Sequence, residues 1–189
     1  MDSVLVVSGS IKGIDLISEL VYSDSKVQVT AAKNSSEARR FISSTDYDLI
    51  IINTPLPDEF GDNLAITVTE ISASGVILIV KNEIADDISA KVEHYGVLIV
   101  SKPIIRQVFT QAKKFALASK NRILSLKSEN ISLQQKIEEI RLVTRAKLIL
   151  IQYLHMTESQ AHRFIEKQAM DMRTSRLEIA QNILKTYET

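Results

Sequence analysis

The sequence contains no cysteine, no long apolar run and no basic leader, and each absence excludes a class of protein. Because none of the 189 residues is cysteine, disulfide frameworks and thiolate metal sites are excluded. No apolar run approaches the roughly 20 residues of a membrane span. The first residues, MDSVLVVSGS, lack the basic stretch of a secretory signal. We therefore expect a cytoplasmic protein with no membrane partner.

A net charge of zero conceals an uneven distribution of charge. Residues 1–100 carry 7 Lys and Arg against 15 Asp and Glu, a net charge of −8. Residues 101–189 carry 16 Lys and Arg against 8 Asp and Glu, a net charge of +8. An acidic front and a basic rear are typical of a regulator whose tail binds a polyanion. A basic coiled-coil surface without a ligand would give the same count, so both interpretations stay open.

Short apolar strands alternate with helical stretches in the first 118 residues. The expected strands are VLVVS, VQVTA, DLIIIN, VILIV and VLIVS, and helices are expected from about Ile11, Ser35, Gly61, Ile84 and Ile104. Five βα repeats with continuous apolar strands indicate a parallel sheet covered by helices on both faces. The sequence therefore predicts a doubly wound α/β domain over residues 1–118.

Two segments carry a resemblance to a known family of such domains. YDLIIINTPLPDEFGDNLA at residues 47–65 and VLIVSKP at residues 97–103 resemble the receiver domains of response regulators. The resemblance implies a flavodoxin-like sheet with strand order 2-1-3-4-5. It also implies that phosphoryl-transfer chemistry would lie at the ends of the strands.

Most of that chemistry is missing. A receiver needs a carboxylate acceptor after its third strand, where this chain has Asn53. The acidic pair that would hold Mg²⁺, an ion that prefers hard oxygen ligands, is replaced by Ser8 and Gly9. We place Val80 where a hydroxyl normally ends the fourth strand, and only Lys102 of the usual set remains. Because an amide cannot form an acyl phosphate, we expect a degenerate receiver with no phosphorylation control, no metal and no cofactor.

Acidic residues near this site offer a weak substitute. Asp58, Glu59 and Asp62 follow the third strand, but an acidic loop is usually solvated, and we expect no rescued metal site. For Lys102 two interpretations stay open. Either it donates a hydrogen bond to the side-chain oxygen of Asn53 and holds the site in one state, or it is a solvated remnant.

A stretch without glycine or proline follows, NRILSLKSENISLQQKIEEIRLVTRAK at residues 121–147. Its apolar residues alternate spacings of three and four, which is the a/d seam of a coiled coil. β-branched residues at a, mostly Leu at d, and Asn130 at an a position favour a parallel homodimer in one register. A single amphipathic helix packed on its own domain would show the same spacing. The predicted linker is residues 119–143, with a seam of Ile123, Leu126, Asn130, Leu133, Ile137 and Ile140.

Three amphipathic helices are predicted in the last 49 residues. One helix ends over residues 145–154. Thr157 with Gln160, and Ser175 with Glu178, form capping boxes that start the other two. Helices this short cannot each bury their own apolar stripe, so the three must pack together. The small side chains that permit a close approach are Ala146, Ala161, Ala169 and Ala180.

This tail resembles the ANTAR family, the RNA-binding helical module of bacterial transcription antiterminators. The resemblance rests on the pair Ala146 and Lys147, on Thr-Glu-Ser-Gln-Ala at 157–161, on Ala-Met-x-x-Arg at 169–173 and on Leu-x-x-Ala-x-x-Ile at 177–183. The family usually has glycine where this chain has Leu148, and often an aromatic residue where it has His162. The first departure bears on helix packing and the second on the RNA surface. We therefore expect a three-helix ANTAR-like module over residues 144–189.

Basic residues recur at one-turn spacing along the predicted module. Lys and Arg contact phosphates, while loop bases stack on aromatic or guanidinium planes. Tyr153, His162 and Tyr187 are candidates for stacking, although a lone aromatic residue more often packs within the fold. His155 and His162 lack a third ligand at suitable spacing, so zinc is not expected. The candidate RNA-binding residues are Arg141, Arg145, Lys147, Arg163, Lys167, Arg173 and Arg176.

Together these patterns predict a dimeric RNA-binding antitermination regulator that is not an enzyme. By resemblance, such proteins bind stem-loops of a nascent leader transcript and prevent a terminator hairpin from forming. A coiled-coil dimer would present two modules to a target with two loops. Two other functions stay open: a DNA-binding regulator whose tail is a helix-turn-helix, and an adaptor whose first domain docks a protein partner.

Overall fold

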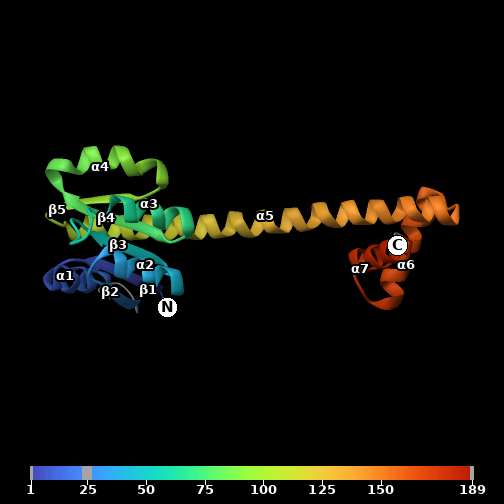
Figure 1. Ribbon diagram of the computed structural model, residues 1–189, viewed down its shortest axis with the longest axis horizontal. Helices are drawn as coiled ribbons and strands as arrows, with labels where there is room; N and C mark the ends of the chain where they lie inside the picture. The colour runs from blue at the N-terminus through green and yellow to red at the C-terminus, as the bar shows by residue number, and fades with distance from the viewer. Residues whose placement is uncertain (1, 23–26, 188–189) are drawn as a thin grey trace. The chain divides into compact units, whose positions relative to one another are not determined.

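The computed structural model describes residues 2–22 and 27–187 (Figure 1). The chain divides into two compact units, Met1–Ser125 and Leu126–Thr189. The first unit is built on a parallel sheet of five strands in the order β2-β1-β3-β4-β5. The strands are β1 (Asp2–Ser8), β2 (Val27–Ala32), β3 (Leu49–Asn53), β4 (Gly75–Lys81) and β5 (Leu98–Lys102). The predicted strand order and all five strands are confirmed.

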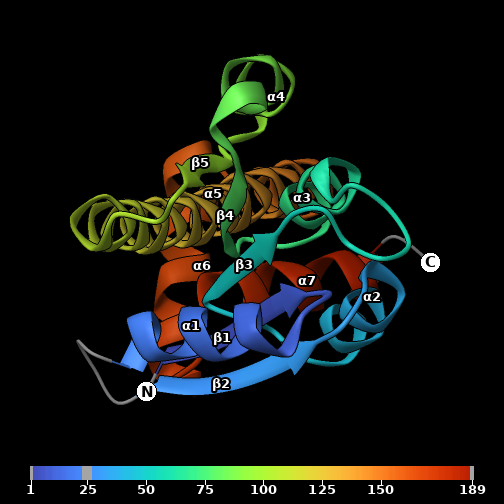
Figure 2. The same cartoon turned by 90° about the vertical axis from the view of Figure 1, so that its left-hand side faces the viewer.

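Helices cover both faces of this sheet (Figure 2). On one face, residues of α1 (Ile11–Tyr22) and α5 (Arg106–Leu154) join the apolar cluster of alternate strand residues. On the other face lie α2 (Ser35–Ser44), α3 (Asp62–Ile71) and α4 (Ala85–Val92), the last flanked by short 3-10 turns at Asn82–Ile84 and Glu93–Tyr95. Strand residues alternate between the two clusters because successive side chains of a strand point to opposite faces.

Helix α5 is held on the sheet by both apolar and ionic contacts. Phe109 and Ala116 are buried in the cluster that they share with β1, β3 and β4. Gly75 at the start of β4 allows this approach, because a Cβ there would lie 2.7 Å from the backbone oxygen of Ala116. Near the end of the first unit, the ammonium of Lys120 donates to the carboxylate of Asp48. Burial raises the pKa of Asp48, but hydrogen bonds from Lys120 and Ser3 outweigh it and hold that pKa below its ordinary value.

The start of α2 is capped from outside the helix. Asn34, the N-cap residue, accepts a hydrogen bond from the backbone N–H of Glu37 at 2.8 Å. The carboxylate of Asp58, in the loop after β3, accepts from the backbone N–H groups of Ser35 and Ser36, each at 3.0 Å, and from both hydroxyls. The free N–H groups of a first helical turn need acceptors and favour negative charge. Asp58 therefore ties the loop after β3 to α2.

The second unit consists of the carboxyl-terminal part of α5, α6 (Glu158–Met172) and α7 (Arg176–Tyr187). The capping box of Thr157 and Gln160 is confirmed, with both of its hydrogen bonds present. At the second predicted box, the Ser175 hydroxyl accepts from the Glu178 backbone at 3.1 Å. The core contains the four alanines expected to permit close packing: Ala146, Ala161, Ala169 and Ala180.

The predicted boundaries at 118/119 and 143/144 both fall inside α5, which is one continuous helix. The division into segments 1–118, 119–143 and 144–189 therefore stays a prediction. Within the described residues, no helix has a stretch both long enough and apolar enough to cross a membrane.

Asp58→Asn should destabilise the first unit at neutral pH by about 1 kcal/mol, the usual value for a lost helix cap. The pKa of Asp58 lies well below its ordinary value of 3.8, because its carboxylate accepts several hydrogen bonds. The bond from the Ser35 backbone lowers the pKa most, and bonds from the Ser35 hydroxyl and from Ser36 lower it further. A carboxyl whose pKa is depressed by folding stabilises the fold above its unfolded pKa and loses that contribution as the pH falls toward its folded pKa. The stability difference between wild type and Asp58→Asn should therefore shrink below pH 3.8.

Hydrogen exchange of the β1 and β3 amides in the full chain would measure this difference at neutral and at acidic pH. Asp15→Asn is the matched control, because Asp15 is exposed on α1. An effect of Asp58→Asn no larger than that of Asp15→Asn would contradict the capping role.

Candidate functional sites

The first candidate site lies where β1 and β3 end side by side. Ser8 and Asn53 are register partners on these strands. The Asn53 side-chain Nδ2 donates to the Ser8 hydroxyl at 2.9 Å, and that hydroxyl donates to the backbone oxygen of Ser10 at 3.3 Å. The Oδ1 atom of Asn53 is buried and has no hydrogen-bond partner within the part of the chain that the structure describes. The two residues predicted to replace an acceptor and a metal ligand therefore bond to each other.

Helix α1 occupies the space directly above this pair. A Cβ atom at Gly13 would lie 2.5 Å from the Ser8 hydroxyl and 2.6 Å from Asn53 Nδ2, so a larger residue there would force these side chains to shift. On the neighbouring side, a Cβ at Gly9 would lie 2.9 Å from the ring of Pro57. Mg²⁺ in proteins usually keeps several water ligands. An amide, a hydroxyl and a glycine supply no carboxylate ligand for such an ion at this edge.

Lys102 follows neither of the two interpretations offered by the sequence. Its ammonium donates to the backbone oxygen of Thr54 at 2.6 Å rather than to Asn53, and it is half-buried rather than solvated. Burial lowers the pKa of Lys102 below its ordinary value, and the nearby charge of Lys81 lowers it further. Lys102 thus holds the backbone that follows the acceptor position.

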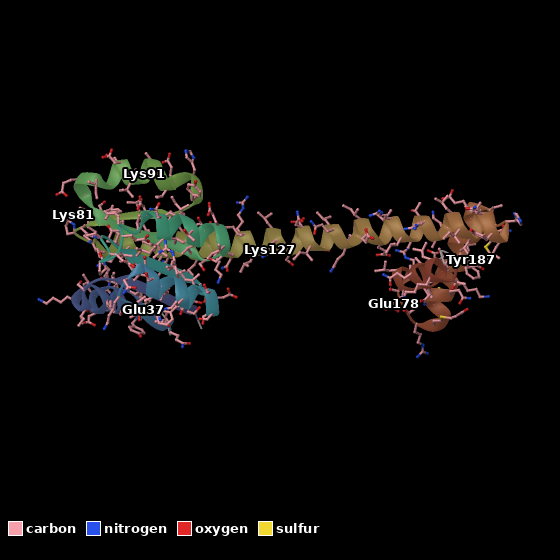
Figure 3. The ribbon with its side chains drawn as sticks, in the orientation of Figure 1. Glu37, Lys81, Lys91, Lys127, Glu178 and Tyr187 are labelled. Carbon is pink, nitrogen blue, oxygen red and sulfur yellow. The ribbon has the colours of Figure 1, made fainter. Side chains whose placement is uncertain are left out.

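Val80 is predicted to stand where a hydroxyl normally ends the fourth strand, and this assignment stays a prediction. It is fully buried in the cluster on the opposite face of the sheet, together with Leu78. Ile77 and Ile79 lie on the face shared with Asn53, so the next residue of β4 on that face is Lys81 (Figure 3). A shift of one residue along a strand reverses the face. Lys81 is therefore the last residue of β4 on the face that carries Ile77 and Ile79.

The acidic residues of the following loop are committed to structural contacts. Asp58 caps α2, and Glu59 pairs with Arg39 of α2 at 3.3 Å. Asp62 is the first residue of α3. Over residues 2–22 and 27–187, no three His, Cys, Asp or Glu residues gather as a metal site would require. The first site therefore offers neither a carboxylate acceptor nor a set of metal ligands.

The second candidate site is the basic surface of the second unit, where the seven predicted residues fall into two groups. Three have acidic partners. Arg141 pairs with Glu138 at 3.7 Å, Lys147 with Glu158 at 3.0 Å, and Arg176 with Glu139 at 3.2 Å. Arg176 also lies 3.9 Å from Glu166. The charge that these residues could offer a polyanion is partly neutralised within the protein.

Three of the others are exposed without an ionic partner among residues 2–22 and 27–187. Arg163 and Lys167 are on α6, and Arg173 follows its last residue. Arg145 is also exposed on α5. Arg173 adopts the left-handed conformation, with φ of 52°, at the turn between α6 and α7. This conformation is uncommon for residues other than glycine.

A groove runs between α5, α6 and α7 on the side of the paired residues. It has a volume of about 420 Å³ and contains both signs of charge. His162 lies in it and approaches Glu166 at 3.2 Å. The groove is lined by Lys136, Glu139, Ile140, Val143, Thr144, Lys147, His162 and Arg176.

The candidates for base stacking are not equivalent. The rings of Tyr153 and Tyr187 lie 5.4 Å apart, tilted by 36°, so each packs against the other. His162 is exposed and faces an acidic residue instead. Leu148, where the ANTAR family usually has glycine, is 59% exposed and therefore does not obstruct helix packing.

Sequence reasoning missed the acidic partners Glu139, Glu158 and Glu166. His162 and Glu166 are four residues apart on one helix, a spacing that the sequence could have revealed. The pairs of Arg176 with Glu139 and of Lys147 with Glu158 join different helices. No spacing along the chain signals them, because they depend on how the helices pack.

Comparisons with known proteins agree with both units. Residues 132–184 match the ANTAR domain family. Transcriptional regulatory protein PdtaR of Mycobacterium tuberculosis, from strains CDC 1551 and H37Rv, is 24% identical over 173 residues, which cover 92% of this chain and 84% of that protein.

Two solved structures share the fold of the first unit. A signal receiver domain of an HD domain-containing protein from Pseudomonas fluorescens Pf-5 has a TM-score of 0.59 at 20% identity and covers 66% of this chain and 92% of that chain. A response regulator receiver domain protein from Clostridium thermocellum has a TM-score of 0.58 at 20% identity and covers 65% and 99%. Residues 132–184 therefore carry the ANTAR match, a domain of receiver fold precedes them, and the chain is similar over most of its length to a transcriptional regulatory protein.

Proposed function

We propose that this chain is an RNA-binding transcription antitermination regulator that acts in the cytoplasm on stem-loops of nascent leader transcripts. The observation that carries the proposal is the ANTAR match over residues 132–184, a range that contains all seven candidate RNA-binding residues. The relative from Mycobacterium tuberculosis is named a transcriptional regulatory protein. Exposed, unpaired cations on α6 support a phosphate-binding surface, since phosphate contacts supply much of the affinity for nucleic acid.

We further propose that phosphorylation of the first domain does not control this activity. Asn53 provides an amide where a phosphorylated receiver needs a carboxylate, and its Nδ2 is engaged by Ser8. Gly13 brings α1 against the same two side chains. Control by another route, such as a protein partner on the first domain, remains compatible with this geometry.

The third part of the proposal is a homodimer formed through α5. The predicted seam residues are at the surface of the single chain, and the apolar ones are substantially exposed: Ile123 48%, Leu126 55%, Leu133 51%, Ile137 66% and Ile140 67%. Five exposed apolar side chains at a/d spacing favour burial against a second helix. Asn130, also exposed, would fix the register of a parallel pair.

Acetyl phosphate with Mg²⁺ should leave the intact mass of the protein unchanged, because no carboxylate occupies the acceptor position. Asn53→Asp alone should also stay unmodified, since Ser8 and Gly9 still supply no acidic metal ligand. Intact-mass spectrometry measures both outcomes. A gain of one phosphoryl group on the wild-type protein, removed by substitution of Asp58 or another acid, would refute the degenerate site.

Leu133→Lys combined with Ile137→Lys should convert a dimer into monomers, because both substitutions place charge in the seam. Sedimentation measures the change at a protein concentration of about tens of micromolar. Weak and stable dimers can be told apart in this range. Ser132→Lys with Gln135→Lys is the matched control, because these residues lie on the same turns but outside the seam. Asn130→Leu should keep the fold but loosen the choice of oligomer. A monomeric wild-type protein would count against the seam.

Full-length protein should enrich RNAs from a pool that carries two hairpins with fixed stems and randomised loops. Arg163→Ala or Lys167→Ala should weaken binding by about 1 kcal/mol and lower the salt slope by roughly one, because each removes one phosphate contact. Lys114→Ala, an exposed lysine of the first unit, is the control. Filter binding across a range of salt concentrations gives both quantities.

Loop sequences should decide affinity in this assay, because single-stranded loops expose readable base edges and A-form grooves do not. Equal affinity for duplex DNA and for the enriched hairpins would instead favour a helix-turn-helix function. Failure to bind any nucleic acid would favour a protein adaptor.

A further inference from the structure

The unpaired cations of α6 border a second hollow, distinct from the mixed-charge groove. Phe164 and Gln168 line this hollow, and Arg163 and Lys167 each precede one of them by one residue. Residues four apart lie on one side of a helix, so the two cations form a row beside the row that lines the hollow. Neither cation has an acidic partner within the described residues. Asp171 is the acidic residue nearest in sequence on this side.

The hollow is bounded by all three helices of the second unit and has a volume of about 200 Å³. Its walls are mainly apolar, and its rim includes Met172, 64% exposed, and Leu154, 43% exposed. Tyr187, at the end of α7 (Figure 3), closes one end and packs against Tyr153. The lining residues are Leu150, Leu154, Phe164, Gln168, Met172, Ile179, Asn182, Ile183, Thr186 and Tyr187.

Two side-chain amides face this apolar space without a hydrogen-bond partner in the part of the chain that the structure describes. They are Gln168 on α6 and Asn182 on α7. Each amide carries both a donor and an acceptor. A flat group with apolar faces and a polar edge would satisfy the walls and the amides together, and an unstacked nucleobase is such a group.

We infer that this hollow is a base-binding pocket of the RNA interface, in which an unstacked loop base lies against Phe164, Met172 and Tyr187. Gln168 and Asn182 hydrogen-bond the edge of the base, and Arg163 and Lys167 contact the flanking phosphates. The inference rests on the proposed RNA-binding function and selects the face of the domain that performs it.

Charge explains why this face, and not the mixed-charge groove, takes the nucleic acid. Arg176 and Lys147, which line the groove, already pair with carboxylates: Arg176 with Glu139 and Glu166, and Lys147 with Glu158. A phosphate entering there would meet these carboxylates and would have to break existing ion pairs. Beside the base pocket, Arg163 and Lys167 have no such pair among the residues that the structure describes. A second copy of this chain would bring its own basic surface to the hollow. Repulsion between the cations of the two copies would disfavour that contact.

The probe is a hairpin with a fixed stem, enriched on wild-type full-length protein from a pool with randomised loops. Loop nucleotides are replaced one at a time by 4-thiouridine, crosslinked by light, and the attached peptides are identified by mass spectrometry. The expected crosslinks lie in residues 164–172 or 179–187. Gln168→Ala and Met172→Ala should each weaken binding about tenfold, the effect of losing one base contact. An abasic site at the crosslinked position should remove this difference from wild type.

Matched controls are available on the same helices. Met170, 78% exposed, is on α6 but does not line the pocket, and Gln181 is an exposed amide on α7 next to Asn182. Met170→Ala and Gln181→Ala should bind like wild type. Lys136→Ala, in the mixed-charge groove, should also leave affinity unchanged. Circular dichroism of every variant should match that of wild type.

The outcomes separate this inference from the proposed function. If wild-type protein enriches no hairpin, both fail. If hairpins bind but crosslink within residues 136–147, or if Met172→Ala and Met170→Ala behave alike, the pocket assignment is wrong while RNA binding stands. A change of oligomeric state in Met172→Ala, with RNA affinity unchanged, would assign the hollow to a protein contact instead.

Discussion

Close packing through alanine is the constraint on which the ANTAR domain depends. Ala146, Ala161 and Ala180 are each fully buried, one on each helix, so the backbones of α5, α6 and α7 approach without large side chains between them. No single helix of this length could bury its apolar stripe alone. The same close packing of the helices sets the widths of the mixed-charge groove and of the base pocket. It also brings Glu139 within reach of Arg176. A larger side chain at any of these positions would therefore alter the charge pattern as well as the core.

The first domain is governed by a different constraint, the shared edge at which parallel strands end. The last residues of β1, β3 and β5, which are Ser8, Asn53 and Lys102, must lie at this edge whatever their chemistry. In this chain, a hydrogen bond joins Ser8 to Asn53, and Lys102 holds the backbone of Thr54. In a phosphorylated receiver, residues at this edge contact a metal ion and a phosphoryl group. In this chain, the residues at the same edge contact other protein groups instead. The receiver fold is therefore present with an amide, Asn53, at the position where the resemblance implies a carboxylate acceptor.

Periodicity carried most of what the sequence could predict. Five strands and the Thr157 capping box follow from local patterns, while the strand order came from the resemblance to receiver domains, and the structure agrees with all three. The hydrogen-bond acceptor of Lys102 could not be predicted from the sequence, because it is the backbone oxygen of Thr54. The charge split was also a poor guide. Residues 101–125 hold six basic residues and no acidic ones, so much of the basic excess belongs to the first unit and not to the ANTAR domain.

The glycine in α1 has an evolutionary consequence. Gly13 lets that helix lie directly on Ser8 and Asn53, with space for no side chain between them. A mutation that restored one carboxylate would bury a charge beside a tightly packed helix, before any metal ligand existed to neutralise it, and buried unpaired charge is strongly unfavourable. Several substitutions would have to arrive together to recover the reaction, while each alone would be selected against. If phosphorylation does not control this protein, as we propose, the packing of α1 would oppose each single substitution that leads back to a phosphorylated receiver.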